Sequence, residues 1–342
     1  MKLISFVIPS YNSERYLNHA VDTILAGGEE VEIIIVNDGS TDATANIADR
    51  YASEYPSIVK AIHKENGGHG SGVNCGVKNA TGVYFKVVDS DDWVDSEALK
   101  LLLDTVRSHL NAGNAPDLYI TNFVYDHAED DTQFVRQFRR QLPANRFFQW
   151  SDTKRFYGSQ LLLMHALMYK TQIIRDSDTV LPEHTFYVDN LFAFKPLPFC
   201  KTMYYCDLDL YHYFIGRADQ SVNIHNLTRR YAQQMRVTKC MYDAYSYTQI
   251  LNMDKRLRQY MLHMLGCVCM NAMMFCCSGG DDASRRKAYS DLWQHTIEKD
   301  CALHRFLRTK GLPLHVCWMP WKFRGWFMLT GYKVLCKINK LG

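Results

Sequence analysis

Acidic side chains follow two apolar segments in the first third of the chain. The run Asp89–Asp92 comes directly after Val83–Val88, and Asp38 follows Val31–Val36. Continuous apolar runs are typical of buried parallel strands, whose carboxyl ends meet at the edge where α/β sheets bind ligands. Carboxylate oxygens there suit Mg²⁺ or Mn²⁺, which also bind substrate phosphates. The sequence therefore predicts a divalent-cation site at this edge.

The acidic run also has a simpler interpretation as a helix cap. Asp is a preferred N-cap residue, and both Asp92 and Asp95 stand before a helix-like segment that begins near Ser96. We assign the cap to Asp95 and keep Asp89 and Asp91 for chemistry. The role of Asp92 stays open between support of the cation and capping.

The segments that would position these carboxylates alternate between strand and helix. Strands are expected at Leu3–Ile8, Val31–Val36, Ile58–Ile62 and Val83–Val88, with helices beginning near Glu14, Asp42 and Ser71. This alternation predicts an α/β fold with a mostly parallel, Rossmann-like central sheet flanked by helices. Further along we expect a helix at Ser96–Leu110, a strand at Asp117–Phe123 and a hairpin or acceptor-side loop within Tyr125–Gln149.

The last third of the chain changes to long helical segments. They are expected at Leu227–Ile250, Asp254–Cys277 and Asp282–Lys299. A chain of 342 residues is also longer than one ordinary domain. We therefore expect an α/β domain over residues 1–222, a helical extension over residues 223–312 and a basic, aromatic tail over residues 313–342.

Composition and charge argue against several classes of protein. The formal net charge is only +3, which gives no basis for nucleic-acid binding. Eleven cysteines without metal-ligand spacing are expected to be reduced core residues, and the apolar segment Tyr260–Cys277 to be a buried helix. Met1 leads directly into the first strand and leaves no room for a signal peptide, so we expect a cytoplasmic protein.

The C-terminal tail is basic and rich in aromatic residues. No acidic residue follows Asp300, whereas eight Lys and Arg residues do. Tryptophan mixed with cations is typical of segments that lie on anionic membrane surfaces. Lys333 interrupts the longest apolar stretch, so we expect the tail to lie on a membrane and not to span it. The alternative is an aromatic helix that packs on the α/β domain.

Four motifs resemble those of the inverting glycosyltransferases of family 2, which have the GT-A fold. They are SFVIPSYNSERYL from Ser5, EIIIVNDGSTDAT from Glu32, NGGHGSGVNCGVKNATGVYFKVVDSDDW from Asn66 and FYVDNLFAF from Phe186. The resemblance implies a Mn²⁺- or Mg²⁺-dependent enzyme that transfers a hexose from a nucleotide sugar, here expected to be a UDP-sugar. The implied acceptor is a hydroxyl of a saccharide or lipid-linked saccharide in cell-surface polysaccharide synthesis.

The same resemblance implies roles for individual residues. Asp38 would accept a hydrogen bond from the imide of uracil, and its alternative is an Asx turn before Gly39. Asp89 would lie near the ribose, and Asp91 would bind the metal. The implied nucleotide-binding residues are Pro9, Tyr11, Asn12, Glu14, Asp38, Gly67, Gly68, Lys86, Asp89 and Ser90.

An inverting transfer needs a base that removes the proton of the acceptor hydroxyl. The resemblance points to Asp189, although Val188 stands where the family often has Glu. Aromatic neighbours would partly exclude water from this carboxylate and raise its pKa toward a useful range. Glu183 and His184 are the alternative bases.

A second departure from the family pattern concerns the cation that helps to bind the diphosphate. Val73 fills the position of a frequent Arg. Lys86 and Arg217 are the candidates to replace it, and we assign Arg217 to catalysis. The alternatives are a Lys86 that snorkels from a sheet edge and an Arg217 that is only solvated. Gly67, Gly68, Gly70 and Gly72 lie close together in a segment that we call the glycine loop. His69 is interpreted as an incidental residue of this loop.

Two other functions compete with transfer. A nucleotide-sugar-binding subunit could regulate or scaffold a glycan synthase without turnover, but the presence of both Asp91 and Asp189 argues against it. A nucleotidyltransferase would need Arg and Lys in a glycine-rich loop after the first strand, where Ser10–Ser13 stands instead.

Overall fold

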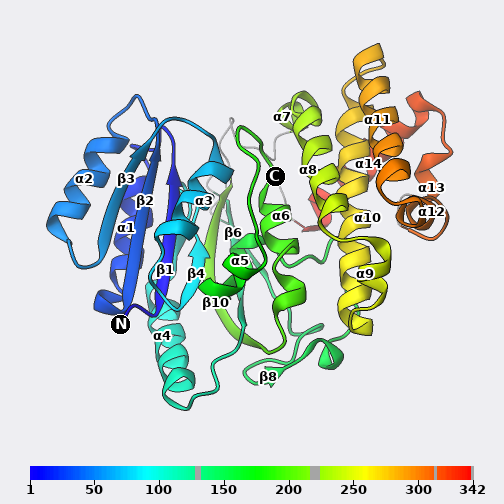
Figure 1. Ribbon diagram of the computed structural model, residues 1–342. Coiled ribbons are helices and arrows are strands. Elements are labelled where there is room, and N and C mark those ends of the chain that lie inside the picture. Colours follow the sequence, from blue (N-terminus) through cyan, green and yellow to red (C-terminus); the bar gives the residue numbers. More distant parts are fainter. Residues whose placement is uncertain (128–131, 216–223, 312–313, 340–342) are drawn as a thin grey trace. The chain divides into compact units, whose positions relative to one another are not determined.

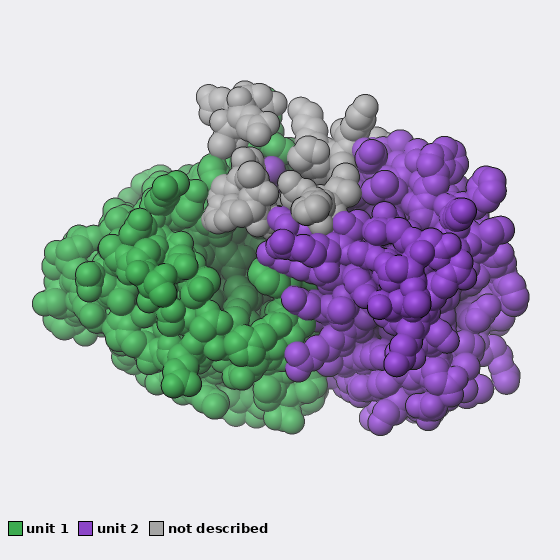
Figure 2. Space-filling view, turned by 90° about the horizontal axis from the view of Figure 1, so that it is seen from above, with its two compact units in different colours: residues 1–153, 162–214 green, residues 154–161, 215–342 purple. Residues whose placement is uncertain are grey.

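The computed structural model describes residues 1–127, 132–215, 224–311 and 314–339 (Figure 1). The chain forms two compact units, unit 1 with residues 1–153 and 162–214 and unit 2 with residues 154–161 and 215–342 (Figure 2). The contacts divide the chain after residue 214, whereas the sequence analysis placed its domain boundary after residue 222. Unit 2 contains both the predicted extension and the predicted tail, together with residues 154–161, which were not expected to join it.

Four parallel strands form one half of the sheet in unit 1. They are β1 (Ile4–Ser10), β2 (Val31–Asp38), β3 (Val59–Lys64) and β4 (Tyr84–Val87), in the order β3-β2-β1-β4 (Figure 1). Every residue of β1 and β2 is buried, as their continuous apolar sequences predict. The sequence therefore predicted this half correctly.

The other half of the sheet is largely antiparallel, so the sheet is mixed. It continues from β4 through β9 (Leu167–Lys170), β6 (Leu118–His127), β10 (Met203–Ile215) and β5 (Trp93–Val94). The predicted hairpin is β6 with β7 (Thr132–Arg136), and β8 (Phe147–Phe148) pairs with β10. Strands β9 and β10 were not predicted, because β10 mixes aromatic and acidic residues without clean alternation.

In the described part of unit 1, six α-helices connect or flank these strands. They are α1 (Leu17–Leu25), α2 (Thr44–Glu54), α3 (His69–Asn79), α4 (Ser96–Asn111), α5 (Thr171–Asp176) and α6 (Asp189–Phe194). Asp95 caps α4 as predicted, since its Oδ1 accepts from the Ala98 N–H at 2.7 Å. A Cβ on Gly72 would lie 2.9 Å from the Cβ of Pro9, so glycine lets α3 approach β1. Pro9 therefore packs beneath α3.

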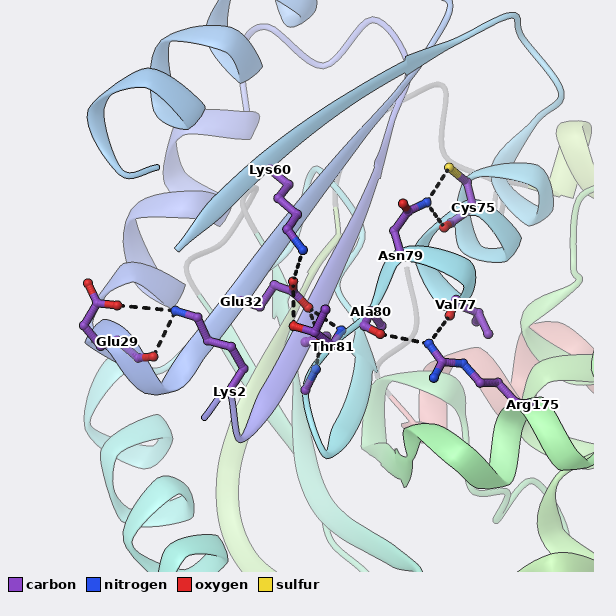
Figure 3. Close-up of polar contacts among 12 residues, drawn as sticks. Lys2, Glu29, Glu32, Lys60, Cys75, Val77, Asn79, Ala80, Thr81 and Arg175 are labelled. Atoms are coloured by element: carbon purple, nitrogen blue, oxygen red, sulfur yellow. Dashed lines mark hydrogen bonds and ion pairs between the residues drawn. The ribbon is translucent and has the colours of Figure 1, made fainter. Parts of the chain in front are cut away.

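The amino edge of the parallel strands carries a buried polar network (Figure 3). Glu32 Oε1 accepts hydrogen bonds from the Lys60 ammonium at 2.5 Å and the Thr81 hydroxyl at 2.9 Å. Its Oε2 accepts from the Ser5 hydroxyl at 2.5 Å and the Thr81 N–H at 2.8 Å. Four donors thus fill the oxygens of one carboxylate and join the starts of β1, β2 and β3 to the turn before β4.

Unit 2 is helical, and several of its helices pack around a central one, α10 (Lys255–Ser278). The other helices are α7 (Ile224–Arg229), α8 (Tyr231–Ala244), α9 (Tyr247–Leu251), α11 (Ala283–Lys299), α12 (Cys301–Thr309), α13 (Leu314–Cys317) and α14 (Trp321–Asn339). One helix was predicted at Leu227–Ile250 and three are found. Ser246 and Gln249 form a capping box, so α9 begins as a separate helix after α8 ends.

Helix α10 is long and apolar enough to cross a membrane by length and composition. However, 67% of its apolar window is buried. Helices α7, α8, α9, α11 and α14 all contact it. It has the burial of a core helix, as predicted from its Met- and Cys-rich sequence. The cysteines that the structure describes are all free thiols.

Candidate active site

The turn after β1 is fastened to the loop after β2. Asn12 has a left-handed backbone with φ of 50°, and its Oδ1 accepts from the Thr41 N–H at 2.9 Å. Glu14 accepts from the Ala43 N–H at 3.0 Å. Tyr11 keeps 54% of its surface exposed. Asn12 and Glu14 therefore shape the turn, whereas the Tyr11 ring is available to stack on a flat ligand.

Asp38 anchors the glycine loop. Its Oδ1 accepts hydrogen bonds from the Gly67 N–H at 2.9 Å and from the Lys64 ammonium at 2.7 Å, and its Oδ2 accepts from the Gly68 N–H at 2.7 Å. These partners lie across the loop, so the Asx turn before Gly39 does not describe this side chain. A carboxylate oxygen accepts about two hydrogen bonds, so Oδ2 keeps a site for a ligand donor.

The carboxylate of Asp89 lies between two histidines. His69, the first residue of α3, places Nε2 2.7 Å from Asp89 Oδ1, and His165 places Nε2 3.8 Å from Oδ2. Burial raises the pKa of Asp89, but the charge of His69 and hydrogen bonds from both histidines outweigh it and lower the pKa. Burial lowers the pKa of His69, and the charges of Asp89, Asp189 and Asp91 raise it overall. The interpretation of His69 as incidental was therefore wrong.

Asp92 joins the acidic loop, residues Asp89–Asp92, to β10 through hydrogen bonds. Its Oδ2 accepts from the Tyr211 hydroxyl at 2.5 Å, and its Oδ1 accepts from the Phe214 N–H at 2.9 Å. Burial first, and then the charges of Asp91 and Asp89, raise its pKa well above the ordinary value. Asp92 thus positions the loop, and the helix-cap alternative is excluded because Asp95 caps α4.

One group of side chains in the described part of the chain has metal-ligand spacing. Candidate ligand atoms of Asp89, Asp92 and His165 all lie within 4.8 Å of one another. His165 belongs to a short 3₁₀ helix, Met164–Ala166, and its buried Nδ1 has no hydrogen-bond partner among the described residues. Two carboxylates and an imidazole fit a divalent cation. Asp91, the predicted ligand, is not one of the three, but its charge acts on Asp92.

Asp189 begins α6 and shares this electrostatic environment. Burial raises its pKa, the charges of His165 and His69 lower it, and the charge of Asp89 raises it, with a raised pKa as the net result. The predicted base is therefore coupled to the predicted cation site. A carboxylate with a raised pKa is a better proton acceptor than an ordinary one.

The loop before α6 is held by α3 and contains strained backbone. The Asn74 side chain donates to the Leu181 carbonyl and accepts from the Leu181 N–H, both at 2.9 Å. His184 and Tyr187 have positive φ of 48° and 66°, which non-glycine residues rarely adopt outside functional sites. Glu183 and His184, the alternative bases, are exposed on this loop. Asn74, which lies within the third sequence motif, therefore holds the loop that leads to Asp189.

Val73, His69 and Ser90 line the region where α3 faces the acidic run Asp89–Asp92. Val73 is 1% exposed and contributes packing. His69, one turn earlier on α3, brings a positive charge to Asp89 instead. Ser90 connects the acidic loop to the turn after β1, because its hydroxyl lies 2.6 Å from the Ser13 hydroxyl.

Lys86 lies beneath the site and not on its surface. Its side chain is completely buried in β4, and its ammonium donates to the His165 carbonyl at 2.6 Å. Burial lowers the pKa of Lys86 to about 7. Neither a snorkelling side chain nor an exposed diphosphate contact describes this residue, which instead positions His165. Arg217, the other predicted cation, lies outside the described residues.

Comparison with known families identifies the region that holds these motifs. The family model described as Glycosyl transferase family 2 matches residues 5–170. The chain carries a family 2 glycosyltransferase domain. This domain contains the acidic loop, His69 and His165, whereas Asp189 lies beyond its matched end.

Two relatives from Bacillus subtilis (strain 168) are similar to parts of the chain. EpsH, named as a glycosyltransferase, is 26% identical over 247 residues, which cover 68% of this chain and 64% of EpsH. GgaB, named as a minor teichoic acid biosynthesis protein, is 36% identical over 110 residues, which cover 31% of this chain and 12% of GgaB. The chain thus spans less than two thirds of either relative.

Two solved structures have a similar fold. S. aureus TarS 1-349 in complex with UDP-GlcNAc has a TM-score of 0.63 at 18% identity and covers 97% of this chain and 92% of that chain. The mannosyltransferase PcManGT from Pyrobaculum calidifontis, in complex with GDP-Man and Mn²⁺, has a TM-score of 0.53 at 12% identity, with coverage of 99% and 86%. These likenesses confirm the predicted GT-A fold and its C-terminal helical region.

Proposed function

We propose that the protein is a metal-dependent inverting glycosyltransferase of cell-surface polysaccharide synthesis. It transfers a hexose from a UDP-sugar to a hydroxyl of a saccharide or lipid-linked saccharide. The observation that carries this proposal is the geometry at Asp89, which lies between His69 and His165 and shares metal-ligand spacing with Asp92 and His165. The teichoic acid name of GgaB supports the class of product, and UDP-GlcNAc in TarS supports the donor.

The carboxylates of the acidic loop and the His165 imidazole fit a divalent cation. Asp89 and His165, two of the three side chains with metal-ligand spacing, would hold it, and Asp91 is the further loop carboxylate that the sequence resemblance implies. Asp92, the third side chain of that group, also accepts a hydrogen bond from Tyr211. When bound, the cation neutralises the charge that develops on the departing diphosphate. An imidazole in the ligand set favours Mn²⁺ over Mg²⁺, which takes oxygen ligands.

Asp189 acts as the general base in the proposed transfer. A carboxylate oxygen of Asp189 receives the proton of the acceptor hydroxyl as that hydroxyl oxygen attacks the anomeric carbon. The attack comes from the face opposite the diphosphate, so the configuration inverts. The raised pKa of Asp189 increases its basicity, and the positive charge of His69 limits that rise, so the carboxylate stays ionised for this step.

The uridine would bind between the turn after β1 and the glycine loop. The exposed Tyr11 ring offers a stacking surface. Asp38 Oδ2, which has one N–H donor in the free protein, would accept the imide N–H of uracil as a second. Ser90 and Asp89 would lie near the ribose and the diphosphate.

A ligand panel tests this proposal. UDP-, GDP- and dTDP-sugars are added with Mn²⁺, with Mg²⁺ or with EDTA, and the melting temperature of the full chain is followed, because a ligand of the folded state raises its stability. We expect UDP-sugars with Mn²⁺ to give the largest increase. Asp91→Ala should remove the metal-dependent increase, whereas Asp49→Ala, at an exposed side chain outside the site, should retain it.

Release of UDP in the presence of saccharide acceptors separates turnover from binding alone. Stabilisation by UDP-sugar without any transfer or hydrolysis would favour the competing function, a regulatory or scaffold subunit of a glycan synthase. Stabilisation by none of the three nucleotide classes would contradict the proposed donor site. We also propose that the enzyme works at the cytoplasmic face of the membrane, where a lipid-linked acceptor would be anchored.

A further inference from the structure

Helix α14 exposes a continuous aromatic face. Phe323 and Trp326 keep 68% and 67% of their surfaces exposed, and Phe327 and Val334 keep 49% and 50%. Their spacing of three, four and seven residues places them on one side of the helix. Contiguous exposed apolar side chains on a folded protein mark an interaction surface. We call Phe323, Trp326, Phe327 and Val334 the α14 outer face.

The opposite side of α14 is firmly packed within unit 2. Arg324 and Met328 are buried, and a Cβ on Gly325 would lie 2.5 Å from the Cys277 carbonyl oxygen of α10. The Arg324 guanidinium donates to the carbonyls of Val316 and Cys317, at 3.1 and 2.9 Å. The helix therefore packs on α10 through one side, so exposure of the other side does not come from a detached helix.

The exposed charged side chains of α14 itself have one sign, and Asp281, the carboxylate near Lys322, is paired with Arg286. Lys322 and Lys333 are exposed on the same helix, and no acidic residue follows Asp300 in the chain. Among the described residues, only α10 has the length and composition to cross a membrane, so α14 fits a surface position. A second copy of this chain would bring the same positive charges together, whereas an anionic bilayer complements both the aromatic and the basic side chains.

We propose that the α14 outer face is a membrane-docking surface that binds anionic lipid bilayers. Phe323, Trp326 and Phe327 enter the boundary between headgroups and acyl chains, and Lys322 and Lys333 contact lipid phosphates. This surface is distinct from the nucleotide-sugar site, and its binding to lipid does not depend on the proposed transfer. Docking would hold the enzyme at the membrane that carries a lipid-linked acceptor.

Vesicle flotation with the full chain tests the docking surface. Protein without sugar nucleotide is mixed with two kinds of vesicle. One contains phosphatidylcholine alone, and the other also contains about 30 mol% phosphatidylglycerol, which makes its surface anionic. We expect binding to the anionic vesicles only, and weakening with salt, because surface charges are screened. The triple variant Phe323→Ser, Trp326→Ser and Phe327→Ser should bind at least about tenfold less.

Two controls make the outcome decisive. Leu101→Ser removes an equally exposed apolar side chain from α4 in unit 1 and should leave vesicle binding unchanged. Lys322→Glu with Lys333→Glu should reduce binding to anionic vesicles while the melting temperature stays the same, because both side chains are exposed. Equal binding by the wild type and the triple variant would overturn the proposal. So would a dimer in solution that the triple variant dissociates, since the face would then be covered by a second copy.

Discussion

The two edges of the parallel strands in unit 1 differ in how their buried carboxylates are compensated. At the amino edge, burial raises the pKa of Glu32, but hydrogen bonds from Lys60, Ser5 and Thr81 lower it overall (Figure 3). At the carboxyl edge, the two histidines lower the pKa of Asp89, whereas the pKa values of Asp92 and Asp189 are raised, mainly by burial and partly by neighbouring carboxylates.

The difference shows that a buried carboxylate can stabilise the fold at one edge and take part in chemistry at the other. Glu32 has four donors around it, so its charge is fully compensated within the folded chain. The carboxyl edge concentrates Asp89, Asp91, Asp92 and Asp189 against two histidines, and it leaves negative charge to be compensated by a cation or a proton. We conclude that the amino edge holds strands together, whereas the carboxyl edge is prepared for ligands.

The largest expected effect comes from the proposed base. Asp189→Asn keeps the shape of the side chain but removes its basicity, so turnover should fall about a thousandfold, within the range for loss of a general base. The increase in melting temperature with UDP-sugar and Mn²⁺ should remain. Steady-state UDP release and thermal shift measure the two quantities, and wild-type turnover by the variant would remove Asp189 from the mechanism.

Loss of the amino-edge carboxylate should affect stability and not chemistry. Glu32→Gln leaves the Lys60 ammonium and the Thr81 N–H without a charged acceptor, and we expect the free energy of unfolding to fall by about 2 kcal/mol. Urea unfolding measures this change. Turnover per folded molecule should match the wild type; a specific loss of turnover would mean that the two edges are not separate in function.

His69 tests how the carboxyl edge is organised. His69→Ala removes the hydrogen bond to Asp89, so the affinity for Mn²⁺ in the presence of UDP should fall about tenfold, as for other residues that orient a metal ligand. Calorimetric titration gives the affinity. The matched control is His63→Ala, because His63 bonds Asn37 and Asp49 instead. Equal loss in both variants would indicate a general effect on stability.

The smallest effect is an opposite pH dependence of stability at the two edges. Glu32 has a lowered pKa, so its contribution is present above the ordinary value of 4.5 and is lost as the pH falls below it. Asp92 has a raised pKa, so its ionisation costs stability as the pH rises above the ordinary value of 3.8. Each effect is at most about 1.4 kcal/mol per pH unit for one proton.

Urea unfolding between acidic and neutral pH, with EDTA to exclude metals, separates these two contributions. Glu32→Gln should flatten the loss of stability on the acidic side. Asp92→Asn should remove the loss that accompanies a rising pH. The same pH dependence in both variants would show that the two carboxylates are not in opposite states.

Local sequence was sufficient for the elements that short-range physics determines. Continuous apolar runs identified β1 to β4, and Asp95 was recognised as the cap of α4, because both depend on neighbours within a few residues. The antiparallel half was incompletely predicted. Strand β10 depends on pairing with segments far away in the chain, and its own sequence has no clear period.

The sequence by itself determined which residue types reach the carboxyl edge: the acidic loop, the glycine loop and Asp189 all follow from motif order. Tertiary structure decided their individual roles. Asp92 accepts a hydrogen bond from Tyr211, 119 residues away, so Asp92 positions the acidic loop. Lys86 became a buried support of His165, and His69 became the partner of Asp89. Such assignments depend on which donors meet each carboxylate after folding, and long-range contacts of this kind leave no local pattern in the sequence.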